Sequence, residues 1–143
     1  MIARMYLSQV GELKARREEI REEIQWLMTC ATRATSRITA TRVSGTPKRD
    51  SMADRAIALA DEREVLKRMD ANIAEAIALR EVLIAGLSEP RWRIVCRLRY
   101  LKGLEWKAVA KEMGVSYRKA LYLHADAMKE LEEEMTQRQV SGL

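Results

Sequence analysis

The chain has 143 residues and carries 26 Lys or Arg against 21 Asp or Glu, which gives a net charge of +5. Helix-forming residues are abundant, Phe is absent, and only two Pro and six Gly occur, so the composition favours an all-helical protein of one or two small domains. The uncharged stretches are much shorter than the ~20 residues that cross a bilayer, and the start gains charges too early for a secretory signal. We therefore expect a cytoplasmic protein.

The residues that carry catalytic or metal chemistry are scarce. His124 is the only histidine, Cys30 and Cys96 are the only cysteines, and they form no CxxC pair. We expect both thiols to be reduced packing residues, and we expect no metal site and no cofactor. The sequence contains no HExxH, GxSxG or GxxxxGK[ST] motif. A single histidine without a nearby acid or nucleophile does not favour an enzyme.

Residues 1–39 have apolar or small side chains at intervals of three and four residues, the pattern of a heptad stripe along a long helix. The stripe consists of Val10, Leu13, Ile20, Ile24, Leu27, Ala31, Ala34 and Ile38. It skips over Arg17, and charged residues fill the positions between its members. The sequence therefore predicts a long helix with one apolar side and otherwise solvated faces.

A loop is expected over residues 40–50, because Gly45 and Pro47 lie there and Pro47 forces Thr46 out of helical geometry. Ser51 is placed to cap a second helix. That helix has a second stripe, which Arg63 and Arg80 interrupt. Its members are Ala56, Leu59, Leu66, Met69, Ile73, Ile77, Ile84 and Leu87.

Neither stripe can be buried within its own helix, since a helix of about 37 residues is about 55 Å long. Residues 1–87 are therefore expected to form a long antiparallel helical hairpin, a coiled coil with its loop at 40–50. Arg17, Arg63 and Arg80 would be costly to bury unpaired, and their placement is typical of register control. We expect these helices also to form a homo-oligomer.

The last third of the chain has the spacing of a helix-turn-helix. Ser88-Glu89-Pro90 ends the second helix, and Pro90 opens a short helix that continues to Leu101. Gly103 precedes a helix of about two turns, Gly114 and Ser116 bracket a tight turn, and a longer helix follows. Gly114 can adopt the left-handed conformation and Ser116 can cap the next helix. We expect this domain over residues 88–135 and a flexible tail over 136–143.

Small and apolar residues on the two helices of the motif can share one core. These are Val109, Ala110, Met113, Ala120, Ala127 and Leu131. His124 lies at the edge of this face, where packing or orientation is favoured over contact with a nucleic-acid backbone. Trp92 and Trp106 are expected in the core or at a domain junction rather than as stacking platforms.

The run LRYLKGLEWKAVAKEMGVSYRKALYLHADAMKEL resembles region 4 of sigma-70-type factors, the helix-turn-helix that reads the −35 promoter element. The resemblance covers about 45 residues. The whole layout is similar to short phage and prophage proteins, among them late transcription regulators of the ArpU and RinA kind. Sigma-like modules usually have Ser or Thr where Glu105 stands and an acid where Ala108 stands. These departures concern the cap of the first helix and an ion pair to Arg99.

The resemblance implies a DNA-contacting surface. Residues 88–131 contain ten Lys or Arg and five acids, whereas residues 51–87 contain five and seven, so the positive excess lies on the expected reader of DNA. Tyr117, Arg118 and Tyr122 occupy the base-contacting positions of region 4, and Lys119 occupies a phosphate-contacting one. Arg118 can present its guanidinium fork to guanine. The predicted DNA-binding residues are Lys107, Lys111, Tyr117, Arg118, Lys119, Leu121 and Tyr122.

The function expected from this resemblance is that of a phage or prophage transcription regulator. It would bind double-stranded DNA at the nucleoid of a bacterial host and act with the host RNA polymerase. A complete sigma factor is not expected, because no segment corresponds to a promoter-melting domain. Two alternatives stay open. One is an oligomeric DNA-packaging protein, similar to a small terminase subunit, and the other is a module that binds RNA polymerase alone.

Overall fold

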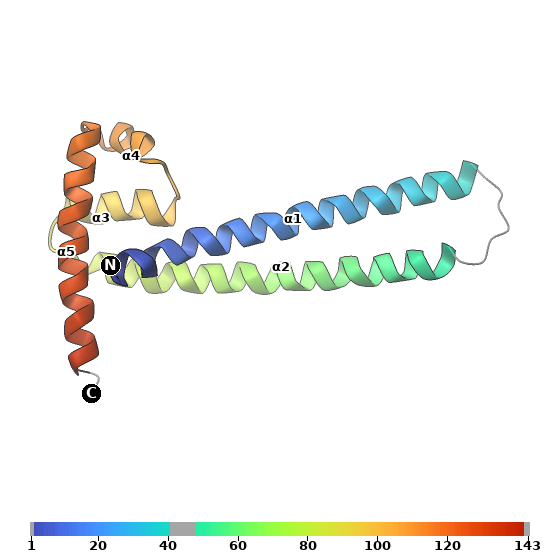
Figure 1. Ribbon diagram of the computed structural model, residues 1–143, viewed down its shortest axis with the longest axis horizontal. Helices are drawn as coiled ribbons and strands as arrows, with labels where there is room; N and C mark the ends of the chain where they lie inside the picture. Colours follow the sequence, from blue (N-terminus) through green and yellow to red (C-terminus); the bar gives the residue numbers. More distant parts are fainter. Residues whose placement is uncertain (1, 41–47, 142–143) are drawn as a thin grey trace. The chain divides into compact units, whose positions relative to one another are not determined.

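The computed structural model describes residues 2–40 and 48–141, and every regular element in those ranges is helical (Figure 1). The elements in chain order are α1 (Ile2–Ala40), α2 (Lys48–Ala85), α3 (Pro90–Cys96), the π-helical η1 (Arg97–Leu101), α4 (Trp106–Met113) and α5 (Tyr117–Ser141). The all-helical class is confirmed. None of the helices described has an apolar stretch that would reach across a membrane.

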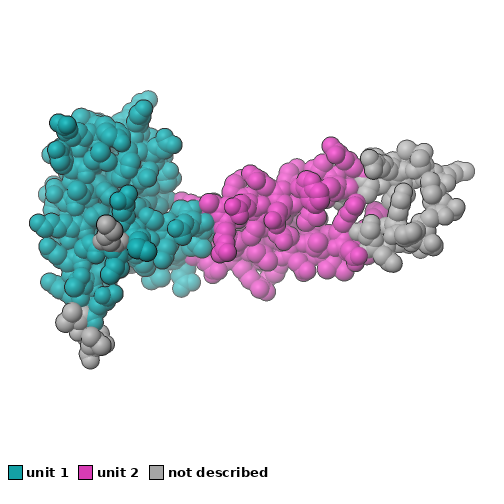
Figure 2. Space-filling model, viewed as in Figure 1, with its two compact units in different colours: residues 1–13, 73–143 teal, residues 14–72 magenta. Residues whose placement is uncertain are grey.

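The helices form two compact units (Figure 2). Unit 1 contains residues 1–13 and 73–143, and unit 2 contains residues 14–72. This division differs from the predicted domain boundary between residues 87 and 88. The reason is packing, because Leu7 of α1 and Ile84 of α2 belong to the same buried cluster as Val95 of α3 and Leu131 of α5.

The core of unit 1 is built where α3, η1, α4 and α5 meet the ends of the two long helices. Val109, Ala120, Ala127 and Leu131 are buried, as the sequence predicted, and Met113 is half-buried. The buried cluster at the centre of unit 1 consists of Ala3, Leu7, Leu83, Ile84, Leu87, Val95, Cys96, Leu98, Tyr100, Val109, Leu123, Ala127 and Leu131. Trp92 and Trp106 are half-buried against this cluster, which confirms their expected packing role.

Within each unit, α1 and α2 run in opposite directions. In unit 1, Arg80 of α2 donates hydrogen bonds to the Tyr6 carbonyl (2.8 Å) and to Gln9 Oε1 (2.7 Å). In unit 2, Arg17 Nη1 lies 3.4 Å from Asp70 Oδ1, and Arg63 Nη2 lies 3.8 Å from Met28 Sδ. The number of the α1 residue rises as that of its α2 partner falls, which is the register of an antiparallel pair.

The side of α2 that packs against α1, called its seam below, is shifted by one residue from part of the predicted stripe. Buried and half-buried side chains repeat in steps of three and four residues, which is the heptad pattern. They include Leu59, Glu62, Leu66, Met69, Ile73, Ala76, Arg80 and Leu83. This repeat places Glu62 in the seam and leaves Arg63 exposed, and it places Arg55 there in place of Ala56. The predicted roles of Arg63 and Ala56 are therefore wrong.

The predicted start of the second helix is also corrected. The second helix begins at Lys48, so Ser51 lies inside it and is not its cap. Lys, Arg and Asp do not block a helix, which lets it begin ahead of the serine. Gly45, Thr46 and Pro47 of the predicted loop lie outside the described residues.

The flexible tail predicted over residues 136–143 is helical as far as Ser141, and residues 142–143 lie outside the described ranges. Met135 packs against the core of unit 1, and Arg138 Nη2 lies 2.8 Å from Glu134 Oε1 one turn earlier in α5. Such i,i+4 pairs favour continuation of the helix.

Candidate nucleic-acid interface

The three-residue connection between α4 and α5 has the predicted geometry. Gly114 ends α4 in the left-handed conformation, with φ of 68° and ψ of 31°, where any residue with a Cβ is strained. The next amide, that of Val115, donates to the Ala110 carbonyl at 3.1 Å and so satisfies the end of α4. Ser116 Oγ accepts a hydrogen bond from the Lys119 amide at 3.1 Å and caps α5. Both predicted caps are confirmed.

The first three turns of α5 have one buried and one exposed side. Ala120, Leu123, His124 and Ala127 are buried and fix the rotation of the helix against the core. Five of the predicted DNA-binding residues of these turns are exposed. Arg118 and Tyr122 lie opposite the buried side, Lys119 and Leu121 flank it, and Tyr117 is exposed at the start of the helix. Lys107 and Lys111 are exposed on α4, four residues apart and therefore on one face. The structure thus leaves all seven predicted DNA-binding side chains accessible.

Large exposed side chains with apolar surface occur on this part of α5. Tyr117 and Leu121 are one turn apart, and so are Arg118 and Tyr122. Tyr122 is 60% exposed. The side chains here combine aromatic surface, hydroxyl groups and a guanidinium, which can contact bases as well as phosphates.

The local charge is positive. The first turn of α5 contains Arg118 and Lys119 and no acidic residue. The positive end of the helix dipole therefore adds to the two cations rather than being neutralised by a carboxylate. A phosphate group would be favoured at this end of α5.

A set of interactions that the sequence did not reveal holds η1, α4 and α5 together. The Tyr100 hydroxyl hydrogen-bonds to His124 Nε2. The His124 and Trp106 rings pack edge to face, with 4.7 Å between ring centres and 70° between their planes. The guanidinium of Arg99 lies over the Trp106 ring, with its central carbon 5.0 Å from the ring centre. Arg99 also donates a hydrogen bond to the Leu104 carbonyl at 2.9 Å.

His124 is 9% exposed, in agreement with its predicted packing and orienting role. Burial lowers the pKa of His124 to about 4, and the nearby charges of Arg4 and Arg99 act in the same direction. The imidazole is therefore neutral at neutral pH. In that state it links the Tyr100 hydroxyl to the Trp106 ring and positions α5 beside α4.

The start of α4 differs from the sigma-like pattern as the sequence indicated. Glu105 has extended backbone geometry, and its side chain forms no capping hydrogen bond within the described chain. Its carbonyl accepts from the Val109 amide at 2.9 Å. Arg99, for which the family pattern implies an acidic partner, contacts Leu104 and Trp106 instead.

The two cysteines are both free, as expected. Cys96 is buried in the core of unit 1, and burial raises the pKa of its thiol to about 12. The neutral thiol is therefore a packing group and a poor nucleophile. Across residues 2–40 and 48–141, no cluster of His, Cys, Asp or Glu has the arrangement needed to hold a metal ion.

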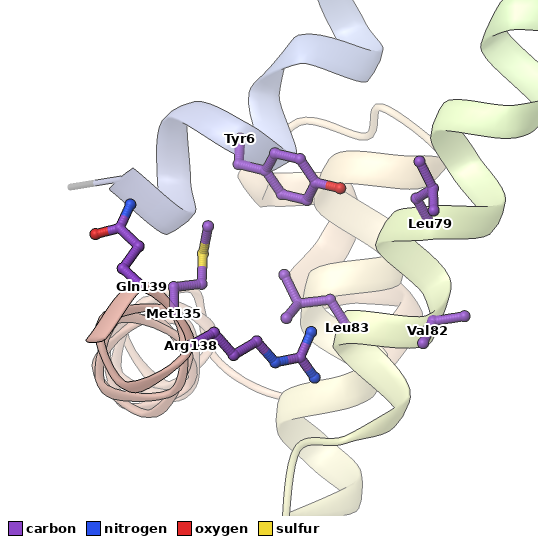
Figure 3. Close-up of a pocket in the computed structure, with 7 residues that line it drawn as sticks. All are labelled: Tyr6, Leu79, Val82, Leu83, Met135, Arg138 and Gln139. Carbon is purple, nitrogen blue, oxygen red and sulfur yellow. The ribbon is translucent and has the colours of Figure 1, made fainter. Parts of the chain in front are cut away.

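A second surface feature of unit 1 is an open, mostly apolar groove of about 420 Å³ between α1, α2 and α5 (Figure 3). Figure 3 shows Arg138 extending from α5 toward Leu83 of α2. The groove is lined by Tyr6, Leu79, Val82, Leu83, Met135, Arg138 and Gln139. None of the seven predicted DNA-binding residues is among the residues that line it.

Comparison of the chain with models of known families, with curated proteins and with solved structures gives no match.

Proposed function

We propose that this protein is a transcription regulator of a phage or prophage that binds duplex DNA through α4 and the first two turns of α5. One observation carries the proposal. The buried side of α5 fixes its rotation, and its exposed side presents Tyr117, Arg118 and Tyr122 immediately after a capped turn. A helix held in this way can enter a major groove, which is wide enough to admit it.

Each exposed side chain has a role in this proposal. Arg118 reads a guanine through two parallel hydrogen bonds, and the tyrosines contact thymine methyl groups or phosphates. Lys119, Lys107 and Lys111 bind phosphates, which adds affinity without base preference. His124 does not touch DNA and positions α5 through Tyr100 and Trp106.

Two substitutions separate sequence reading from phosphate binding. Arg118→Ala is expected to cost about 1–3 kcal/mol on a preferred duplex and to relax the preference at one base pair. Lys119→Ala is expected to weaken binding to all duplexes similarly and to reduce the dependence on salt. Fluorescence anisotropy with preferred and random duplexes measures both effects.

Matched controls come from the same helix. Arg138→Ala and Lys129→Ala remove the same kinds of exposed side chain from later turns of α5, and we expect little change in affinity from either. If these variants lose as much affinity as Arg118→Ala and Lys119→Ala, binding rests on overall charge and the proposed reading surface is wrong.

We propose further that the protein modulates transcription by a host polymerase that already carries its own sigma factor. Opened strands are captured largely by stacking on aromatic side chains, and the seven Trp and Tyr residues of this chain are dispersed along it. In a reconstituted assay, transcription should respond to the protein only with the complete holoenzyme. Promoter opening by core polymerase and this protein alone would contradict this step.

A further inference from the structure

The described residues of unit 2 do not form a buried core. None of its described side chains is fully buried, and seam residues such as Ile24 and Leu66 are only half-buried. Ile57 and Val65 are exposed, and Trp26 is 66% exposed. A pair of helices covers only one side of each helix, so the remaining apolar side chains face water unless another molecule packs on them.

The contacts within unit 2 define two sides of the helix pair. Arg63 of α2 contacts Met28 of α1. Each follows a half-buried seam residue of its own helix by one position: Met28 follows Leu27, and Arg63 follows Glu62. Residues that precede a seam position by one therefore lie on the opposite side. Trp26 and Val65 are on that side, where Cys30 adds a half-buried apolar thiol. We call it the Trp26 face.

The outermost positions of the Trp26 face repeat every seven residues in both helices. On α1 they are Glu19, Trp26 and Arg33, and on α2 they are Asp54, Asp61 and Arg68. All six side chains are exposed, and Arg68 also lies 4.0 Å from Glu64 of its own helix. The Trp26 face is therefore a charged surface with one large aromatic side chain near its middle.

Each helix has an acidic residue seven positions before the middle of the face and a basic residue seven positions after it. Trp26 and Asp61 are at the same level, because each is nine residues from a member of the Arg17–Asp70 pair. This pattern is complementary to itself when it is reversed. A second copy packed in the opposite direction places its Arg33 opposite Glu19 and its Arg68 opposite Asp54.

We infer that unit 2 binds a second copy of this chain through the Trp26 face, in an antiparallel arrangement with two-fold symmetry. In this arrangement Trp26 meets Trp26 of the second copy, so apolar surface is joined to apolar surface. In a parallel arrangement each Trp26 ring would instead pack on an Asp61 carboxylate of the other copy, so neither ring would gain an apolar contact and both carboxylates would be desolvated. The antiparallel arrangement gives Trp26 its apolar contact, and its cost is the single pair of Asp61 carboxylates that it places side by side. The inference does not depend on the proposed DNA binding.

Sedimentation velocity of the full chain over a wide range of concentrations tests the inference. The wild type is expected to be a dimer, and Trp26→Glu is expected to weaken association by at least about tenfold. Because Trp26 is exposed, this variant should keep the helical content of the wild type, which circular dichroism checks. Val82→Glu is the matched control, since Val82 is 69% exposed and lies in unit 1.

Charge reversal tests the antiparallel pairing. Glu19→Arg is expected to weaken the dimer, and adding Arg33→Glu to the same chain is expected to restore it. Asp61→Asn is expected to strengthen it, because the two Asp61 carboxylates face each other beside the symmetry axis.

Several results would overturn the inference. A strictly monomeric wild type would do so, and so would a ring of larger mass. Disruption by Val82→Glu with no effect of Trp26→Glu would assign association to the groove of unit 1. Rescue of Glu19→Arg by Arg68→Glu but not by Arg33→Glu would show a parallel pair instead.

Discussion

His124 is a single residue whose protonation is linked to folding. Its pKa is about 4 in the folded chain because burial disfavours the charged ring, against about 6.5 for an unburied histidine. As pH falls below about 6.5, the unfolded chain takes up this proton before the folded chain does. The contribution of neutral His124 to stability is complete above about pH 6.5 and is lost as pH falls toward 4.

We therefore predict that His124→Gln reduces the acid sensitivity of the fold. Between pH 6.5 and 4 the wild type should lose up to about 1.4 kcal/mol of unfolding free energy per pH unit through this group. The variant should lack this contribution, although it is expected to be less stable at pH 7. Urea unfolding at several pH values measures the difference in unfolding free energy between the wild type and the variant. The contributions of the carboxyl groups, which both proteins share, cancel in this difference. Equal pH slopes would show that His124 is not buried as the structure has it.

At the scale of the elements, the turn between α4 and α5 gives a prediction with an internal control. Gly114→Ala is expected to destabilise unit 1 by about 1 kcal/mol, because alanine is strained at a positive φ. Ser116→Ala should cost about as much through loss of the cap. Gly11 lies inside α1 with open space around the position of a Cβ, so Gly11→Ala should stabilise by about 0.5–1 kcal/mol.

Thermal unfolding of the three variants checks these signs. Destabilisation by Gly11→Ala, or none by Gly114→Ala, would contradict the backbone geometry of the two sites.

The elements that could be predicted from the sequence are those determined locally. Gly114, Ser116 and Pro90 act within one or two turns of their own position, and their roles follow from residue type and spacing. The exposed side of α5 was also predictable, because the buried positions repeat with the helical period. The family resemblance added the contact roles of Arg118 and Lys119, which stay predictions.

The seam of α2 was harder to predict because either of two neighbouring charged residues can interrupt its apolar stripe. The sequence pattern favoured Arg63 as that residue, but Glu62 occupies the seam. Burial and the nearby charges of Glu23 and Asp61 raise the pKa of Glu62. A single helix does not show which of two adjacent charged residues will face its partner, because that depends on the register of the other helix.

Contacts between residues distant in the sequence had no local signal. Tyr100 and His124 are 24 positions apart, and the residue types alone do not indicate that they meet. The π-helical geometry of η1 also lacks a signature in its sequence. The extent of unit 1 along the chain was missed for the same reason. The heptad stripe of α1 resumes at Ile20 after Arg17, so its pattern does not mark the boundary at residue 13.

At the scale of the whole molecule, the helices proposed to contact DNA depend on the start of the chain. Leu7 is fully buried in the same cluster as Val109 and Leu131. Leu7→Ala is predicted to cost about 2–5 kcal/mol through lost burial and a cavity, and to reduce DNA binding at temperatures where unit 1 then unfolds. Chemical denaturation and anisotropy, measured on the same samples, test the link.

Leu79→Ala is the control for this prediction, because Leu79 is 55% exposed and its truncation should change stability by less than about 0.5 kcal/mol. If Leu7→Ala leaves unit 1 as stable as Leu79→Ala does, then residues 1–13 are not part of its core.

The central claim is that α4 and the outer side of α5 bind duplex DNA. Chemical-shift mapping of backbone amides, with the isotope-labelled chain titrated by a duplex selected from a random pool, tests it most directly. The claim predicts the largest changes at Lys107, Lys111 and residues 116–122, with the amides of residues 14–33 and 52–72 nearly unchanged. Failure of the pool to yield a preferred duplex, or changes concentrated in unit 2 or around the groove of unit 1, would contradict it.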